Sequence, residues 1–225
     1  MVPVQLDEYP DLPRAMLPPH VDVHICSTEG EIQSACNAIL EEIMDDSAVI
    51  QVGFDMEWEF NNDQSSKSSH KTALIQLACF TAVYLLRVHL LKILPGSLKT
   101  ILTSSQIVKI GRNVGGDYAK LSRDFPDFTP PPRHRGKLVG VVELGAFAKA
   151  KNAVVNGNVS LATITAASLG LNLSKEARLS EWGAPQLSEE QKHYAALDAW
   201  IALEIWTIFR DKYTIKSCCT CRLSY

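Results

Sequence analysis

Four acidic residues stand out because each lies in an apolar or glycine-rich stretch, where carboxylates are unusual. They are spread over most of the 225-residue chain, in the order Asp55, Glu57, Asp117 and Asp198. Bringing four carboxylates together in apolar surroundings costs free energy unless a cation neutralises them. No histidine–cysteine set accompanies them, so their hard oxygen ligands favour Mg²⁺ or Mn²⁺ over zinc. The sequence therefore predicts a site for divalent metal ions.

A strand and a helix start are expected to hold the first three carboxylates. Asp55 and Glu57 end an apolar, strand-like run over residues 48–58, and residues two apart on a strand point to the same face. Asp117 follows two glycines at the start of an expected helix, where the helix dipole tolerates a carboxylate. The alternative for the Asp-x-Glu pair is an ordinary pair of exposed surface charges.

An expected helix over residues 188–213 carries the fourth carboxylate and two candidates for positioning a water molecule. Tyr194 lies four residues before Asp198 and His193 lies five residues before it. On a helix these separations correspond to about 40° and about 140°, so only one of the two side chains can face the metal ions.

The chemistry that fits such a site is hydrolysis of a phosphodiester bond. Two divalent ions about 3.5–4 Å apart commonly perform it, one activating the attacking water and the other stabilising the leaving oxygen. Tyr194 would hold the attacking water as an orienting group or a weak base.

Composition limits the class of protein. At 46% hydrophobic and 21% charged residues, the chain can bury one sizeable core. The net charge of −3 argues against a surface built for bulk DNA binding, so any nucleic-acid contact is expected to be local. No apolar run reaches the roughly 20 residues of a membrane span, and the proline-rich start does not resemble a secretory signal. Cys26, Cys36 and Cys79 are expected to be reduced core thiols of an intracellular protein.

Helical and strand-like patterns alternate and predict an α/β protein. Residues 1–20 are expected to form a flexible lead, residues 21–213 one catalytic domain, and residues 214–225 a cysteine-containing tail. The crowded cysteines of that tail lack the paired spacing of a structural zinc site. A capped helix is expected from Thr28 to about Met44, and further helices over 98–103, 115–125 and 160–169. Strands are expected over 48–58, 72–80, 82–88 and 107–110. A loop is expected over 130–135, followed by a strand that fades into a helix over 138–144.

Three ordered motifs resemble those of the DnaQ-like 3′–5′ exonucleases that carry four acidic residues and a tyrosine. The likeness covers about residues 25–213 and is strongest to exonuclease domains of the Werner-syndrome type, with ribonuclease D next. The flanking residues of these domains favour Tyr194 over His193, which is then expected on the exposed opposite side of its helix. The motifs are Phe54–Trp58 with Thr72–Ala78, Gly116–Leu121 with Arg123–Phe125, and Leu179–Trp182 with Gln191–Ala199.

The resemblance implies a ribonuclease H-like fold: a mixed five- to six-stranded sheet, antiparallel in its first three strands and flanked by helices. It implies that two Mg²⁺ or Mn²⁺ ions bind the four carboxylates and that Tyr194 positions the nucleophilic water. It also implies removal of nucleoside 5′-monophosphates from a nucleic-acid 3′ end, with DNA favoured, and a nuclear role in DNA repair. The alternatives are a ribonuclease D-like enzyme that processes RNA 3′ ends and a catalytically silent nucleic-acid-binding scaffold.

Five further residues are candidates for contacts with the substrate. The apolar ones would stack on or wedge against the terminal nucleotide, and the cations would hold phosphates. The alternatives are core packing for the apolar side chains, capping of the strand-to-helix turn for the asparagine, and a solvated helix face for the cations. The candidates are Met56, Trp58, Asn113, Lys120 and Arg123.

Overall fold

The computed structural model describes residues 9–41, 49–59 and 71–219, with side chains described as far as residue 210. Its main sheet has six strands, which are β1 Asp22–Cys26, β2 Ile50–Trp58, β3 Thr72–Ala78, β4 Ala82–Leu86, β5 Ile107–Gly111 and β8 Val141–Glu143. The helices of the described part are α1 Glu29–Glu41, α2 Gly96–Thr103, α3 Val114–Asp124, α4 Leu144–Ala150, α5 Leu161–Leu169 and α6 Glu189–Cys219, with a 3₁₀ turn at Val88–Leu90.

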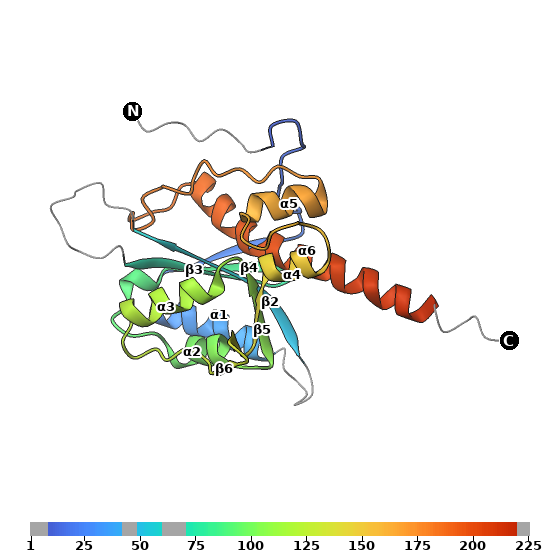
Figure 1. Ribbon diagram of the computed structural model, residues 1–225. Coiled ribbons are helices and arrows are strands. Elements are labelled where there is room, and N and C mark those ends of the chain that lie inside the picture. Colours follow the sequence, from blue (N-terminus) through green and yellow to red (C-terminus); the bar gives the residue numbers. More distant parts are fainter. Residues whose placement is uncertain (1–8, 42–48, 60–70, 220–225) are drawn as a thin grey trace.

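The helices cover both faces of the sheet, whose strand order is β1-β4-β3-β2-β5-β8. Helices α1, α2 and α3 lie on one face, and α4, α5 and α6 lie on the other (Figure 1). Strands β2, β3 and β4 are antiparallel neighbours, whereas β1, β5 and β8 each run parallel to the strand beside them. The predicted mixed sheet, antiparallel in the first three expected strands, is therefore confirmed.

Two short strand pairings differ from the sequence prediction. Strand β1 was not expected from the sequence, although its Val23 and Ile25 alternate with Asp22 and His24, and only Cys26 of its five residues is buried. The expected loop over residues 130–135 instead begins a small hairpin, in which β6 Arg133–His134 pairs with β7 Lys137–Leu138. Positive φ angles at Arg135 and Gly136 make its tight turn.

The ends of several expected elements also shift. Helix α6 continues to Cys219, past its expected end near residue 213, so residues 214–219 of the expected tail are helical. Met44, Ala48 and residues 220–225 lie outside the described part of the chain. Within that part, no helix is long and apolar enough to cross a membrane. Cys26 and Cys36 are buried, as expected of core thiols, whereas Cys79 is half-buried.

Helix α6 packs very closely against β2, and a glycine makes this approach possible. A Cβ atom added at Gly53 would lie 1.9 Å from the backbone oxygen of Ala199 on α6. Any side chain at this position would therefore force the helix away from the strand. The close packing brings the residue before Ala199, Asp198, next to the carboxylates of β2.

Part of the expected N-terminal lead packs against the folded body. The backbone N–H of Ala15 donates to the carbonyl of Asn172 over 2.8 Å, and the Asn172 N–H donates to the carbonyl of Pro13 over 2.8 Å. Ala15 is 1% exposed and belongs to an apolar cluster with Leu173 and Leu197. Residues 13–15, which we call the N-terminal strap, thus cover the segment that links α5 to α6.

Candidate active site

The four predicted carboxylates and the predicted tyrosine line one cleft of about 670 Å³. Asp55, Glu57 and Asp198 form its tightest group, with one carboxylate oxygen of each within 4.8 Å of the others. Asp117 lies on the wall of the same cleft, outside that group. The structure therefore gathers residues that are up to 143 positions apart in the sequence.

Strand β2 positions two of these carboxylates through its alternation of faces. Phe54 and Met56 point into the core and are 1% and 2% exposed, so Asp55 and Glu57 point to the opposite face, toward the cleft. Glu57 is itself only 8% exposed. This burial excludes the alternative of an exposed surface pair.

Helix α3 positions Asp117, and its first turn is held by Glu143. The Glu143 carboxylate accepts hydrogen bonds from the backbone N–H groups of Asn113, over 2.7 Å, and of Val114, over 3.1 Å. It also pairs with the Arg112 guanidinium over 3.0 Å. Asn113 adopts a left-handed backbone conformation, with φ of 64°, and its side chain makes no capping hydrogen bond. Glu143, and not Asn113, thus caps the strand-to-helix turn.

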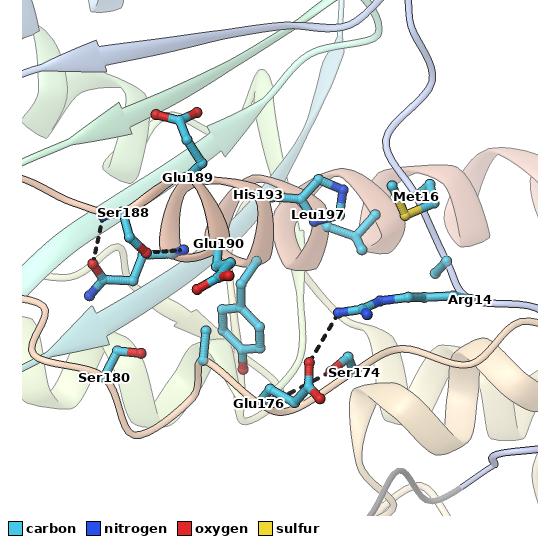
Figure 2. Close-up of a pocket in the computed structure, with 14 residues that line it drawn as sticks. Arg14, Met16, Ser174, Glu176, Ser180, Ser188, Glu189, Glu190, His193 and Leu197 are labelled. Carbon is cyan, nitrogen blue, oxygen red and sulfur yellow. Dashed lines mark hydrogen bonds and ion pairs between the residues drawn. The ribbon is translucent and has the colours of Figure 1, made fainter.

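Helix α6 positions Tyr194 and Asp198 on one face, as their spacing predicts. The Tyr194 hydroxyl is hydrogen-bonded to the Asp198 carboxylate, and its ring packs 5.9 Å from the ring of Trp182. His193 lines a second cavity of about 700 Å³ with Arg14 of the N-terminal segment (Figure 2). The expectation of an exposed His193 is wrong, because the N-terminal segment covers that side of the helix and leaves the ring only partly accessible.

The carboxylates of the cleft hold their protons more tightly than ordinary acidic groups. Burial, the largest cause, raises the pKa of Asp55 to about 7. Burial followed by the negative charge of Asp55 raises the pKa values of Glu57, Asp117 and Asp198 well above the usual range. The Oδ2 atom of Asp117 and the Oδ1 atom of Asp198 are buried without a hydrogen-bond partner among the described residues. Orphaned oxygens and mutual repulsion are what a bound cation relieves, so this donor set fits hard divalent ions.

The raised pKa values predict an inverted pH dependence of stability for the metal-free protein. Between about pH 4, where free carboxyls titrate, and about pH 7, the folded state holds protons that the unfolded state has released. Its free energy of unfolding in EDTA should therefore fall as the pH rises through this window. Urea unfolding at several pH values measures the effect, and Mn²⁺ should restore stability mainly at the upper end. Stability that rises with pH over the same window in EDTA would contradict the assignment.

The candidate substrate contacts separate into two groups. Trp58, Asn113 and Met56 all line the cleft, and Trp58 is 38% exposed. The side chain of Met56 is only 2% exposed and packs in the core, so it is not available for stacking. Lys120 pairs with Asp124 over 3.0 Å, and its ammonium also lies 5.6 Å from the centre of the Trp58 ring. Arg123 is exposed on α3, and neither it nor Lys120 lines the cleft.

Four charged residues near the carboxylates were not predicted from the sequence. Arg112, Lys175 and Arg178 line the cleft, and Glu143 holds the start of α3. Lys175 and Arg178 stand three apart in the segment directly before the Leu179–Trp182 motif. This closeness to a recognised motif is the sequence signal that could have identified them. Their position opposite the carboxylates depends on the path of an irregular segment, which no periodicity reveals.

Comparisons with known proteins show the family to which the chain belongs. Residues 23–214 match the model of a family described as 3′–5′ exonuclease. A 3′–5′ exonuclease of Drosophila melanogaster is 30% identical over 174 residues, which cover 75% of this chain and 47% of the relative. The chain thus spans about half the length of the curated relatives that it matches.

Solved structures show the same fold at low sequence identity. The EXO domain of Aedes aegypti Nibbler superposes with a TM-score of 0.71 at 20% identity, covering 88% of this chain and 91% of that one. Escherichia coli RNase D superposes with a TM-score of 0.65 at 19% identity, and the match covers 87% of this chain and 46% of RNase D. These likenesses confirm the predicted ribonuclease H-like architecture.

Proposed function

Because this chain belongs to the DnaQ-like 3′–5′ exonuclease family, we propose that it hydrolyses nucleic acid from the 3′ end and releases nucleoside 5′-monophosphates. The observation that carries the proposal is the cleft that joins four buried carboxylates and a tyrosine. An intact set of these groups also argues against a catalytically silent scaffold.

Asp55, Glu57, Asp117 and Asp198 would hold two divalent ions, Mg²⁺ or Mn²⁺. When bound, such ions supply positive charge to the attacking and leaving oxygens of a phosphodiester. The partnerless oxygens of Asp117 and Asp198 support this assignment. The chain's own contribution is to fix the carboxylates on three rigid elements, β2, α3 and α6, so that their oxygens are aligned before the substrate arrives.

Tyr194 orients the attacking water in this proposal. Burial and then the charge of Asp198 raise the pKa of its hydroxyl far above neutral, so the group keeps its proton. A protonated hydroxyl orients a water by hydrogen bonding and cannot accept its proton as a phenolate would. This favours an orienting role over the weak-base role that the sequence left open.

Replacing Tyr194 and His193 separately tests this assignment. We expect Tyr194→Phe to lower kcat about a hundredfold, because the water loses its orienting hydrogen bond while the ring still packs on Trp182. We expect His193→Ala to keep kcat within about threefold, because His193 faces the second cavity. Single-turnover cleavage of a 3′-labelled oligonucleotide measures both. An inactive His193→Ala with an active Tyr194→Phe would overturn the assignment.

For the substrate, we propose DNA first, with a nuclear role in DNA repair. The likeness of the three motifs to Werner-type exonuclease domains supports it. RNA 3′-end processing is the second candidate, and it is favoured by a fold neighbour, RNase D, which is named as an exoribonuclease involved in structured RNA processing.

Oligonucleotides of one sequence, made as DNA and as RNA and labelled at either end, test the proposal. We expect stepwise shortening from the 3′ end with Mg²⁺ or Mn²⁺, mononucleotide 5′-phosphates as products, and no reaction in EDTA. The ratio of the DNA and RNA rates decides between the two substrates. No metal-dependent shortening of either one would overturn the proposed activity.

A further inference from the structure

We propose that Arg178 binds the phosphodiester under attack and that the N-terminal strap holds Arg178 in place for this task. The inference rests on the proposed exonuclease function and adds to it a phosphate-binding residue with its supporting segment. The strap is formed by residues 13–15, and Arg178 lies on the segment between α5 and α6 that the strap covers.

The charges of the cleft indicate that a further cation would be needed to balance the negative charge of the substrate. Four ionised carboxylates and two divalent ions cancel, so the negative charge of the phosphodiester would be uncompensated. That charge grows as the leaving oxygen departs, and a preorganised cation opposite it stabilises the transition state. A guanidinium suits the position, because its planar N–H groups can bind two phosphate oxygens at once.

Arg178 is the cation of the described cleft that remains available. Arg112 is committed to structure, since its Nε donates to the carbonyl of Val159 over 2.6 Å and its Nη1 pairs with Glu143. Lys175 lines the same wall and also takes part in other interactions. The guanidinium of Arg178 has no hydrogen-bond or ion-pair partner within the described part of the chain, and the residue is exposed.

Arg178 also lies in the same cleft as the predicted metal-binding carboxylates. Its side chain lines this cleft together with Asp55, Glu57 and Asp198. The guanidinium is therefore part of the wall that a substrate in this cleft would meet. A phosphate held between the carboxylate-bound ions and Arg178 would contact positive charge on both sides.

The segment that carries Arg178 is irregular and depends on its neighbours for its position. At its start, the strap pairs with Asn172, and Ala15 packs against Leu173. At its end, the backbone carbonyl of Arg178 accepts a hydrogen bond from the buried Trp182 indole over 3.4 Å. The segment is thus held at Asn172 and Leu173 by the N-terminal strap, and at Arg178 by Trp182.

The strap supports the segment beside the second cavity. The cavity is lined by Ser174 and Glu176 of this segment and by His193 and Leu197 of α6 (Figure 2), while Ala15 of the strap packs against Leu197. Arg14 reaches Glu176 over 3.1 Å, but both side chains are mostly exposed, so this ion pair contributes little. The main support is the backbone pairing of the strap and the burial of Ala15.

The first experiment tests Arg178 itself. We expect Arg178→Ala to lower kcat about a hundredfold on a 3′-labelled DNA oligonucleotide, with Mn²⁺ affinity changed less than threefold. Arg178→Lys should recover part of the loss, and added guanidinium chloride at low millimolar concentration should partly rescue the alanine variant. A merely structural role would not respond to guanidinium. Arg210→Ala, which removes an arginine bonded to Gln51 at the other end of β2, is the matched control and should remain within twofold of the parent.

The second experiment tests the strap by a double-mutant cycle. Ala15→Leu overfills a site that is 1% exposed and should shift the strap, lowering kcat about tenfold in the parent protein. In the Arg178→Ala background the same change should have almost no effect, because the residue that the strap positions is gone. Ala38→Leu on the exposed face of α1 is the control for the added side chain.

The outcomes separate this inference from the proposed function. If the parent protein shortens oligonucleotides but Arg178→Ala does so at an unchanged rate, the inference fails and the exonuclease function stands. Multiplicative effects in the double mutant would leave the phosphate role to Arg178 and overturn the role of the strap. An inactive parent protein would overturn the proposed function itself.

Discussion

Replacing Asp198 by asparagine should lower kcat by at least about a thousandfold. Asp198 completes the tightest carboxylate group, hydrogen-bonds Tyr194 and has a second oxygen without a partner. Asparagine keeps the shape of the side chain but supplies neither the negative charge nor a second ligand oxygen. The loss should therefore appear both in turnover and in the affinity for Mn²⁺.

The same variant should be more stable than the parent in the absence of metal. Asp198 is buried beside Asp55, and its pKa is raised by burial and by that neighbour's charge, so removing its charge relieves repulsion. We expect a higher melting temperature in EDTA at pH 8, which separates inactivity from unfolding. Glu204→Gln, on the same helix but outside the cleft, is the control and should retain activity. An Asp198→Asn enzyme within tenfold of the parent would exclude Asp198 as a metal ligand.

Replacing Gly53 by alanine should damage both the fold and the site, although Gly53 touches no substrate. The new Cβ atom would lie 1.9 Å from the backbone oxygen of Ala199, and backbone cannot move aside as a flexible side chain does. Helix α6 would have to lift from β2, at a cost of about 2–3 kcal/mol in the free energy of unfolding. The same movement separates Asp198 from Asp55, so we expect kcat to fall about a hundredfold.

Urea unfolding and single-turnover cleavage measure these two effects. Gly30→Ala on α1 provides the matched control, because an added Cβ there meets nothing within 4 Å. Alanine is a better helix residue than glycine, so the control should be equally or slightly more stable, by up to about 1 kcal/mol. A Gly53→Ala protein with parental stability and activity would show that the close contact between α6 and β2 does not position Asp198.

Local periodicity explains why much of the site could be predicted from the sequence. The alternation of a strand puts Asp55 and Glu57 on one face, and the turn of a helix puts Tyr194 beside Asp198. The antiparallel strands could likewise be predicted, because each is an apolar run bounded by polar residues. These features depend on spacings of two or four residues.

Contacts between distant segments explain what could not be predicted. Arg178 faces the carboxylates only because residues 13–15 and Trp182 fix an irregular segment. His193 is partly covered because the N-terminal segment lies over α6. Strand β1 is a different case, because Val21, Val23 and Ile25 alternate with Asp22 and His24 in the period of two that is typical of a strand, and this short pattern was overlooked.

The packing of α6 across β2 also determines when during its synthesis this protein can become a nuclease. Domains generally fold as units during synthesis, so a domain is complete only when its last packed element has emerged from the ribosome. Here β2 supplies Asp55 and Glu57 early, but Asp198 arrives only with α6, after the sheet has been made. A nascent chain therefore lacks a complete set of carboxylates until α6 has emerged and docked. The proposed metal-dependent cleavage is thus available only after α6 has docked on β2.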